Sequence, residues 1–307
     1  MRIAAIVVNW NGGDENLDCV EALLEQGTAL ERVYFVDNGS TNGSAERIAL
    51  AFPDVTLIVN DANLGFGGGN NIGMAAALAD GAEAILIVNN DVVMPADTVA
   101  HLAEVLEQEP EIGIVGPRVL YRPDPTRVWA AGGTLTWRQN LTTLRGHGAR
   151  DGERWRTAED VDYVAGCCLL VRASVLREIG DFDSDYFAYT EDVDFCLRAA
   201  EAGYRTRCQG SVAVYHAPSS ATGGGYNPRR KYMMGVNSVW FMRAYAQPQD
   251  WCKFILFDVL TLPIVWLFGL FSGRGKAVLA KALGILDGLR GRRITAEVMR
   301  PGYSRLW

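Results

Sequence analysis

Two short acidic motifs in this chain of 307 residues combine the side chains that a catalytic site needs. The first is Asn89-Asn90-Asp91, which directly follows the apolar run of residues 85–88. The Asp91 carboxylate can hold a hard divalent cation, and the two amides add neutral hydrogen-bond donors and acceptors. The same triplet can instead form a simple turn, because all three residues favour turns.

The second acidic motif is Glu191-Asp192, where we expect a helix to begin after Thr190. Acids in a first helical turn interact favourably with the helix dipole, which is a purely structural role. The neighbouring acid and the nearby aromatic rings of Tyr186 and Phe187 also raise the pKa of a carboxylate. Such a carboxylate can act as the general base that removes a proton from an acceptor hydroxyl.

Three further positions carry polar groups that can serve a ligand. Asp37 ends an apolar run, and its carboxylate can accept hydrogen bonds from a base or a ribose, or cap the next helix. The glycine-rich residues 65–69 precede an expected helix, so their backbone N–H groups can approach a phosphate. They match neither the Rossmann fingerprint nor the P-loop, since Asn70 replaces the required glycine and no Gly-Lys pair follows. His216 ends an expected strand and can complete a metal site with Asp91.

The elements that must position these residues alternate regularly over the first 90 residues. The expected strands are residues 3–8, 32–36, 55–59 and 85–88. The expected helices run from Asp14 to about residue 26, from the end of the loop 37–44 to about residue 52, and from the end of the stretch 63–73 to residue 80. This alternation predicts an α/β fold with a parallel sheet that is covered by helices. The polar loops should then meet at the carboxyl edge of the sheet, where such sheets bind ligands.

The rest of the chain predicts a less regular set of elements. Residues 117–160 lack a clear period, and we expect hairpins and a mobile loop there. Residues 161–171 predict a buried strand that is broken at Gly166. The other expected elements are helices at 96–108, at 174–180 and from 191 to about 203, strands at 112–115 and 212–215, a Gly/Ser-rich loop at 219–228, and a helical region from Arg229 onward.

Composition restricts the class of protein. The net charge is −7 and no basic stripe is present, which argues against a nucleic-acid-binding protein. The six cysteines show no Cys-x-x-Cys spacing, so we expect reduced thiols in the cytoplasm, with neither disulfides nor a zinc site. Met1 leads directly into the first expected strand, and no signal peptide is expected.

The C-terminal part has a different character. Residues 254–271 are apolar except for one acid and are interrupted by one proline, and residues 274–307 carry eight basic against two acidic side chains, a net charge of +6. An apolar segment followed by a basic tail can anchor a protein at an anionic membrane surface. A buried core helix or a dimer face is the alternative. We therefore expect a catalytic domain at 1–235 and a helical, membrane-associating extension at 236–307.

Together, these motifs resemble the inverting GT-A glycosyltransferases of family 2. The resemblance covers residues 3–235 and lies in the joint order and spacing of five motifs. The form of residues 63–70 is closest to the rhamnosyltransferase-like branch. The five motifs are Asn9-Trp10-Asn11, the stretch 36–44, the stretch 63–73, Asn89-Asn90-Asp91 and Glu191-Asp192.

The resemblance implies a GT-A fold, a dTDP- or UDP-sugar donor and a divalent metal, Mg²⁺ or Mn²⁺. Asp91 would hold the metal, because its triplet stands where the family has Asp-x-Asp, and His216 would complete the metal site near the diphosphate. Asp192 would be the catalytic base, with Glu191 beside it. The donor-binding residues that the resemblance implies are Val8, Asn9, Asp37, Asn63, Gly65, Asn70, Asn89, Asn90 and Asp91.

Two departures from the family pattern qualify these expectations. Asn89 replaces the first Asp of Asp-x-Asp, so two carboxylates do not bind the metal, and the Gln-x-x-Arg-Trp motif of processive synthases is missing.

We expect transfer of a sugar, rhamnose by likeness to this branch, to a hydroxyl of a cell-surface or lipid-linked saccharide, at the inner face of the cell membrane. A sugar-nucleotide nucleotidyltransferase and a non-catalytic saccharide-binding protein on the same fold are the alternatives.

Overall fold

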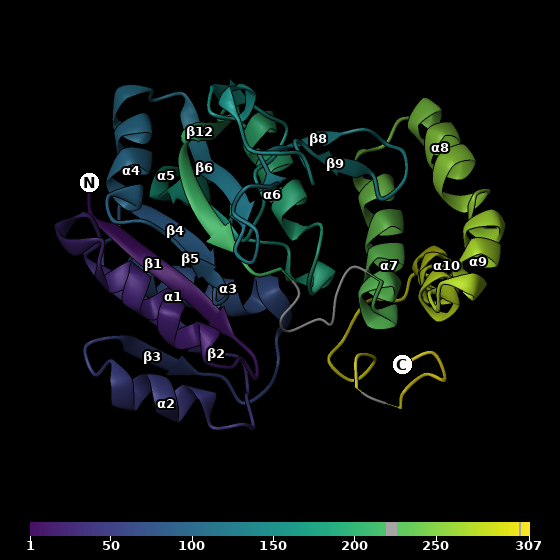
Figure 1. Cartoon of the computed structure of the whole chain (residues 1–307), viewed down its shortest axis with the longest axis horizontal. Coiled ribbons are helices and arrows are strands. Elements are labelled where there is room, and N and C mark those ends of the chain that lie inside the picture. The colour runs from purple at the N-terminus through teal and green to yellow at the C-terminus, as the bar shows by residue number, and fades with distance from the viewer. Residues whose placement is uncertain (219–225, 301) are drawn as a thin grey trace.

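The computed structural model describes residues 1–218, 226–300 and 302–307, so the expected Gly/Ser-rich loop lies largely outside the described residues. A mixed sheet with the strand order β10-β12-β6-β11-β4-β1-β2-β3 forms the body of the molecule (Figure 1). These strands are β1 Ile3–Asn9, β2 Arg32–Asp37, β3 Thr56–Val59, β4 Ala84–Asn89, β6 Ile112–Tyr121, β10 Ala158–Asp160, β11 Cys168–Arg172 and β12 Arg205–His216. The short strands are β5 Val92–Val93, β7 Val128–Ala130, β8 Gly133–Leu135 and β9 Thr142–Leu144.

Strand direction follows the predicted α/β pattern in the first half of the chain. Strands β1 to β4 run parallel to one another, and β6 runs parallel to β12. Strand β11 is antiparallel to both of its neighbours, β4 and β6. The predicted fold class is therefore confirmed, with one inserted strand that alternation alone did not indicate.

The predicted strand at residues 161–171 is wrong in its first half. Only Cys168–Arg172 joins the sheet as β11. The backbone N–H of Gly166 donates to the Asp192 carboxylate at 2.9 Å instead of to a neighbouring strand. A side-chain contact thus replaces the strand pairing here. The strands expected at 112–115 and 212–215 are longer than predicted, since β6 and β12 pair from one end of the sheet to the other.

Helices cover both faces of the sheet, and each face has its own apolar core. Alternate residues of β4 divide between them: Ile85 and Ile87 pack toward one face, and Leu86 and Val88 toward the other. This two-sided burial explains the unbroken apolar run in the sequence. The helices of this part are α1 Glu15–Leu24, α2 Ser44–Ala51, α3 Gly65–Ala79, α4 Thr98–Gln108, α5 Ala173–Ile179 and α6 Glu191–Glu201, with 3-10 turns at Gly27–Ala29, Glu153–Trp155 and Ser184–Tyr186.

The glycine-rich stretch is not a loop before a helix, because α3 begins at Gly65 itself. Its glycines bring the helix close to β1: a Cβ at Gly69 would lie 2.8 Å from Val8 Cγ1, and one at Gly73 would lie 2.6 Å from Ile6 Cγ2. The N–H of Phe66 donates to the carbonyl of Phe187 at 2.6 Å. Close helix–strand packing, rather than phosphate contact alone, therefore accounts for these glycines.

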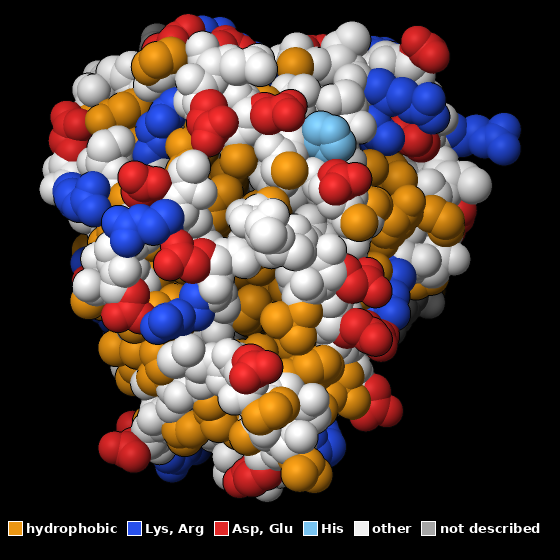
Figure 2. All heavy atoms as spheres, turned by 90° about the vertical axis from the view of Figure 1, so that its left-hand side faces the viewer, with side chains coloured by type: hydrophobic (Ala, Val, Ile, Leu, Met, Phe, Trp, Pro, Cys, Tyr) orange, Lys and Arg blue, Asp and Glu red, His pale blue; other side chains and the backbone are white. Residues whose placement is uncertain are grey.

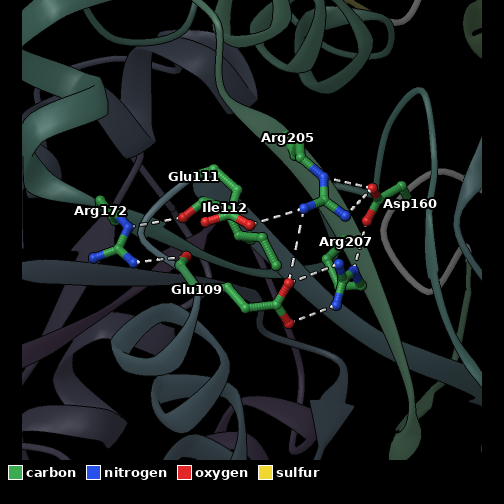
Figure 3. Close-up of polar contacts among 7 residues, drawn as sticks. All are labelled: Glu109, Glu111, Ile112, Asp160, Arg172, Arg205 and Arg207. Atoms are coloured by element: carbon green, nitrogen blue, oxygen red, sulfur yellow. Dashed lines mark hydrogen bonds and ion pairs between the residues drawn. The ribbon is translucent and has the colours of Figure 1, made fainter.

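Four polar and charged side chains fix the register of β12 at the end opposite to His216. Arg207 donates to both Glu109 oxygens at 2.9 and 3.1 Å and to Asp160 at 2.6 Å, and Arg205 also donates to Asp160 at 2.6 Å (Figure 3). Multiple and bidentate contacts of this kind give geometric specificity. The network joins β12 to β10 and to the loop before β6. It thereby helps to position the other end of β12, where His216 lies.

The surface on the N-terminal side carries charges of both signs. Figure 2 shows Lys and Arg side chains interspersed with Asp and Glu over this face, with apolar atoms between them. No continuous basic stripe runs over the face that the figure shows.

The C-terminal helices form a separate group at one end of the molecule (Figure 1). They are α7 Pro228–Tyr245, α8 Pro248–Phe254, a π-helical turn at Ile255–Val259, α9 Leu262–Phe271 and α10 Gly275–Leu289. Helices α7 and α10 pack backbone against backbone, since a Cβ at Gly284 would lie 2.2 Å from the Tyr232 carbonyl oxygen. The predicted C-terminal helices are confirmed. The expected domain boundary at residue 235 falls within α7, and the division into two domains stays a prediction.

One helical stretch is long and apolar enough to cross a membrane by length and composition. Among the described residues it runs over Pro248–Phe271, and its most apolar window of 18 residues has a mean hydropathy of 2.2 and is 17% buried. A core helix would be mostly buried, so this segment exposes apolar surface that the described residues do not cover.

Candidate active site

The buried amide of Asn9 organises the loop at the end of β1. Its Nδ2 donates to Asp37 at 2.7 Å and to Ser44 at 2.8 Å, and its Oδ1 accepts from Gly12 N and Asn16 Nδ2, each at 3.0 Å. Both ends of the amide are therefore engaged, and the side chain is fully buried. In this arrangement Asn9 holds the loops after β1 and β2 together and positions the Asp37 carboxylate.

A second amide, Asn38, connects the loop after β2 to the residues at the start of α3. Its Nδ2 donates to the Gly65 carbonyl at 2.8 Å and to Asn63 Oδ1 at 3.2 Å, and its Oδ1 accepts from Leu64 N at 3.2 Å. Asn63 also accepts from Gly65 N at 2.8 Å. Asn38 and Asn16 are not among the predicted donor-binding residues, although both lie within or beside the sequence motifs.

Asn70 presents a polar atom without a partner at the same edge. Its Nδ2 donates to the Phe66 carbonyl at 2.9 Å, while its Oδ1 is buried and has no hydrogen-bond donor among the described residues. Such an atom is costly to bury unless something satisfies it. Val8, the other expected donor-binding residue here, lies beside α3 at the position where Gly69 approaches β1.

The triplet 89–91 connects the two halves of the sheet edge. Asn89 N donates to the Cys167 carbonyl at 2.8 Å, and Asn90 Nδ2 donates to Asn16 Oδ1 at 2.6 Å. Asn89 Oδ1 is buried and receives no hydrogen bond within the described part of the chain. The three residues thus form the expected turn, and that turn also directs polar atoms into the site.

Asp91 and His216 lie next to each other. His216 Nε2 is 3.1 Å from Asp91 Oδ1, because the short strand β5 pairs with the end of β12. The edge of Trp129 packs on the His216 ring at a centroid distance of 4.7 Å, and both polar side chains are buried. Two motifs that are 125 residues apart in the chain therefore meet as the sequence suggested.

These residues fit a metal that is shared with a phosphate ligand. Carboxylate oxygens suit Mg²⁺ and Mn²⁺, and an imidazole can add a nitrogen ligand. Over residues 1–218, 226–300 and 302–307, no group of three or more His, Cys, Asp or Glu side chains is arranged to hold a metal. Magnesium is commonly bound by one or two carboxylates together with substrate phosphates. Asp91 and His216 match that partial donor set.

The acid pair begins α6 and is held by backbone donors. Asp192 Oδ2 accepts from Gly166 N and Oδ1 accepts from Val193 N, each at 2.9 Å. Thr190 occupies the N-cap position, but its side chain makes no capping hydrogen bond. Burial raises the pKa of Asp192, and the hydrogen bonds from Gly166 and Val193 oppose that shift.

The Glu191 side chain is more buried than that of Asp192. Burial, and secondly the charge of Asp192, raises the pKa of the Glu191 carboxyl well above its ordinary value. Its Oε2 has no hydrogen-bond partner in the residues that the structure describes. Two adjacent acids in one site rarely ionise together, so the pair divides into a better and a worse stabilised carboxylate.

A single turn, residues 165–167, joins the two acidic motifs. Gly166 donates to Asp192, and the Cys167 carbonyl accepts from Asn89. Burial raises the pKa of the Cys167 thiol, and the charges of both Asp91 and Asp192 add to that effect. The two acids therefore face one region on either side of this turn. The broken strand at Gly166 was the only sign of this turn in the sequence.

A mostly parallel α/β sheet with acidic motifs at its carboxyl edge is the architecture of a GT-A-like glycosyltransferase. The profile of Glycosyl transferase family 2 matches residues 4–180, and the chain belongs to this family. Over 213 residues it is 30% identical to an N-acetylglucosaminyl-diphospho-decaprenol L-rhamnosyltransferase of Mycobacterium tuberculosis, covering 62% of this chain and 68% of that protein. The predicted family and its rhamnosyltransferase-like branch are confirmed.

Solved structures show the same fold. The mannosyltransferase PcManGT of Pyrobaculum calidifontis, in complex with GDP-Man and Mn²⁺, matches with a TM-score of 0.55 and 16% identity over 95% of this chain and 88% of that chain. GalNAc-T7 with UDP, GalNAc and Mn²⁺ matches with a TM-score of 0.58 and 12% identity over 78% of this chain and 50% of that chain. The expected GT-A fold is confirmed.

The raised pKa of Glu191 predicts an unusual response of stability to pH. A carboxyl whose pKa is higher in the folded state stabilises the fold below its unfolded pKa, and this contribution is lost as pH rises through the folded pKa. Glu191→Gln keeps the shape of the protonated acid and removes this titration. We expect its melting temperature to exceed that of the wild type by a margin that widens from pH 5 to pH 8.

Thermal unfolding at several pH values checks this expectation. Glu201→Gln, at the exposed end of the same helix, is the matched control and should follow the wild type. A melting temperature of Glu191→Gln that falls below the wild type at pH 8 would show that Glu191 is ionised and stabilised in the fold.

Proposed function

We propose that this glycosyltransferase is an inverting, metal-dependent enzyme that moves a sugar, rhamnose, from a nucleotide-sugar donor to a hydroxyl of a lipid-linked saccharide. The observation that carries the proposal is the turn 165–167, which brings Asp192 and the Asn89-Asn90-Asp91 turn to one site. The rhamnosyl group and the lipid-linked acceptor are inferred from the name of the mycobacterial relative.

The chemistry follows from the positions of the two acids. The acceptor hydroxyl attacks the anomeric carbon, its proton passes to Asp192, and the bond between that carbon and the diphosphate oxygen breaks. The hydrogen bonds from Gly166 and Val193 favour the ionised form of the Asp192 carboxylate against the effect of burial and fix its orientation. A divalent cation held by Asp91 and His216, when bound, would offset charge on the diphosphate leaving group.

The alternatives explain less of the site. A nucleotidyltransferase should carry a basic residue in the loop after the first strand, and residues 9–13 contain no Lys or Arg. A saccharide-binding protein has no need for a buried acid pair beside an Asp–His pair, each of which is expensive to bury. Hydrolysis of a sugar-nucleotide donor in the presence of Mn²⁺ separates the transferase from both alternatives.

Asp192→Asn tests the base. The amide keeps the shape of the side chain but cannot accept the proton, and general-base catalysis is worth roughly 10²–10⁴-fold. We expect that loss in the transfer rate with little change in donor affinity. Glu191→Gln should cost less. A nearly normal rate for Asp192→Asn together with an inactive Glu191→Gln would assign the base to the other acid.

Asp91→Asn tests the metal site. The variant keeps the size of the side chain and removes the charge that a divalent cation needs. We expect calorimetry with Mn²⁺ to show that the affinity for a nucleoside diphosphate falls by at least roughly 10–100-fold, which is the cost of removing a residue that only supports a metal ligand. Asp91 is assigned as a ligand itself. Asp97→Asn makes the same change at an exposed position six residues away and should bind normally. Unchanged metal-dependent binding by Asp91→Asn would contradict the assignment.

Peripheral attachment to the inner face of the membrane is part of the proposal. Seven large apolar side chains along the helical stretch before residue 272 are each at least half exposed: Leu256, Leu260, Ile264, Leu267, Phe268, Leu270 and Phe271. The basic residues of 274–307 follow directly, and each basic residue near an anionic surface is worth about 1 kcal/mol. Apolar surface and positive charge are thus combined in one part of the chain.

Sedimentation with anionic vesicles checks the attachment. We expect the wild type to sediment with the vesicles, and the double variant Phe268→Asp/Phe271→Asp to bind about tenfold more weakly, because two exposed rings are removed from the apolar surface. Leu50→Asp changes an equally exposed side chain on α2 and is the control. Equal partition of the double variant and the wild type would show that this face does not meet lipid.

A further inference from the structure

A cluster of cations lies between the acid pair and the apolar helix. Lys231 Nζ lies 5.0 Å from the centre of the Tyr226 ring, and the Arg274 guanidinium carbon lies 4.5 Å from the same ring. Arg230 lies 5.0 Å from the ring of Tyr189, two residues before Glu191. We call Arg230, Lys231 and Arg274 the cationic strip.

Two members of the strip, Lys231 and Arg274, carry positive charge that no described carboxylate pairs with. Within residues 1–218, 226–300 and 302–307, neither Lys231 nor Arg274 has a carboxylate in ion-pair distance. Asp258, the nearest acid, already pairs with Lys281 and accepts from Asn140 N at 3.1 Å. Like charges gathered on one aromatic ring repel each other unless an anion joins them.

Lys231 is the most enclosed member of the strip. Burial, together with the charges of Lys281 and Arg230, lowers the pKa of Lys231 to about 8, against the opposing effect of Asp258. A small crevice of about 20 Å³ opens beside it, with Gln139 on its polar side and Leu262 and Val265 of α9 on its apolar side. The crevice has room for about one water-sized group, so a larger anion would rest at its mouth.

The order of surfaces along the molecule matches the order of groups in one kind of ligand. The protein presents exposed apolar side chains on α9, then the cationic strip, then Tyr189 and the acid pair. A lipid-linked saccharide has a hydrocarbon chain, then a diphosphate, then a sugar. We propose that the cationic strip binds the diphosphate of the lipid-linked acceptor and so delivers the acceptor sugar to Asp192. This proposal rests on the proposed function.

The β8–β9 hairpin supports this arrangement because it contacts both the C-terminal helices and the region of Asp192. At its tip, Asn140 accepts from Lys281 Nζ at 2.9 Å and donates through its backbone to Asp258, inside the C-terminal helices. At its base, Gly133 pairs with Tyr163, whose hydroxyl feels the charge of Asp192. The apolar helices are thereby held at a fixed place relative to the catalytic base.

Binding of farnesyl diphosphate to the full chain in neutral detergent, with EDTA and a saturating nucleoside diphosphate, tests the proposal. We expect Lys231→Gln, which removes a half-buried cation, to weaken binding by at least about tenfold. Arg274→Gln, at an exposed position, should weaken binding by a smaller factor. Lys231→Arg should restore binding. Lys276→Gln removes an exposed lysine from the same helix as Lys281 and should leave the affinity unchanged.

Three results would overturn the proposal. Affinities of Lys231→Gln and Arg274→Gln equal to the wild type would show that the strip does not hold the diphosphate. An equal loss in Lys276→Gln would show only general surface charge. Inorganic diphosphate that binds as tightly as farnesyl diphosphate would show a free-anion site without a lipid. Because no donor or catalysis is involved, these failures are distinct from a failure of Asp192 as the base.

Discussion

The inserted antiparallel strand β11 is the constraint on which the site depends. Strands β4, β1 and β2 all bring their carboxyl ends to one edge of the sheet, and β11 enters the sheet at that same edge because it runs the other way. The turn that precedes it must therefore lie among the polar loops. From that place Gly166 reaches Asp192 and Cys167 reaches Asn89. A parallel strand in this position would put the turn at the opposite edge.

Neutral amide side chains make most of the hydrogen bonds that hold the loops around the acids. Asn9 and Asn38 each make at least three hydrogen bonds to loops from different strands. An amide can donate and accept at once without adding charge to a site that already holds several carboxylates. A fully satisfied buried network also restricts the loops to one arrangement. Asn89 and Asn70 keep buried oxygens without a hydrogen-bond donor in the described structure, at the same edge of the sheet.

The sequence predicted the parts of the fold that local pattern controls. The first four strands, their helices and the meeting of Asp91 with His216 follow from apolar periodicity and from the rule that parallel strands share a carboxyl edge. The direction of β11 did not follow, since pairing is decided by strands far away in the chain. The glycines at 65–69 were read as a loop because their reason lies in contact with Val8 and Phe187, which no local pattern contains.

The acid pair shows how burial can assign different tasks to adjacent carboxyls. Asp192 receives two backbone N–H groups, which favour its ionised form against the cost of burial. Glu191 Oε2 receives none in the described structure, and the neighbouring negative charge adds to its own burial. The ionised form is therefore better stabilised on Asp192, and the protonated form is favoured on Glu191. The better stabilised carboxylate of the pair is thus the side chain that the Gly166 turn fixes beside the Asn89-Asn90-Asp91 turn.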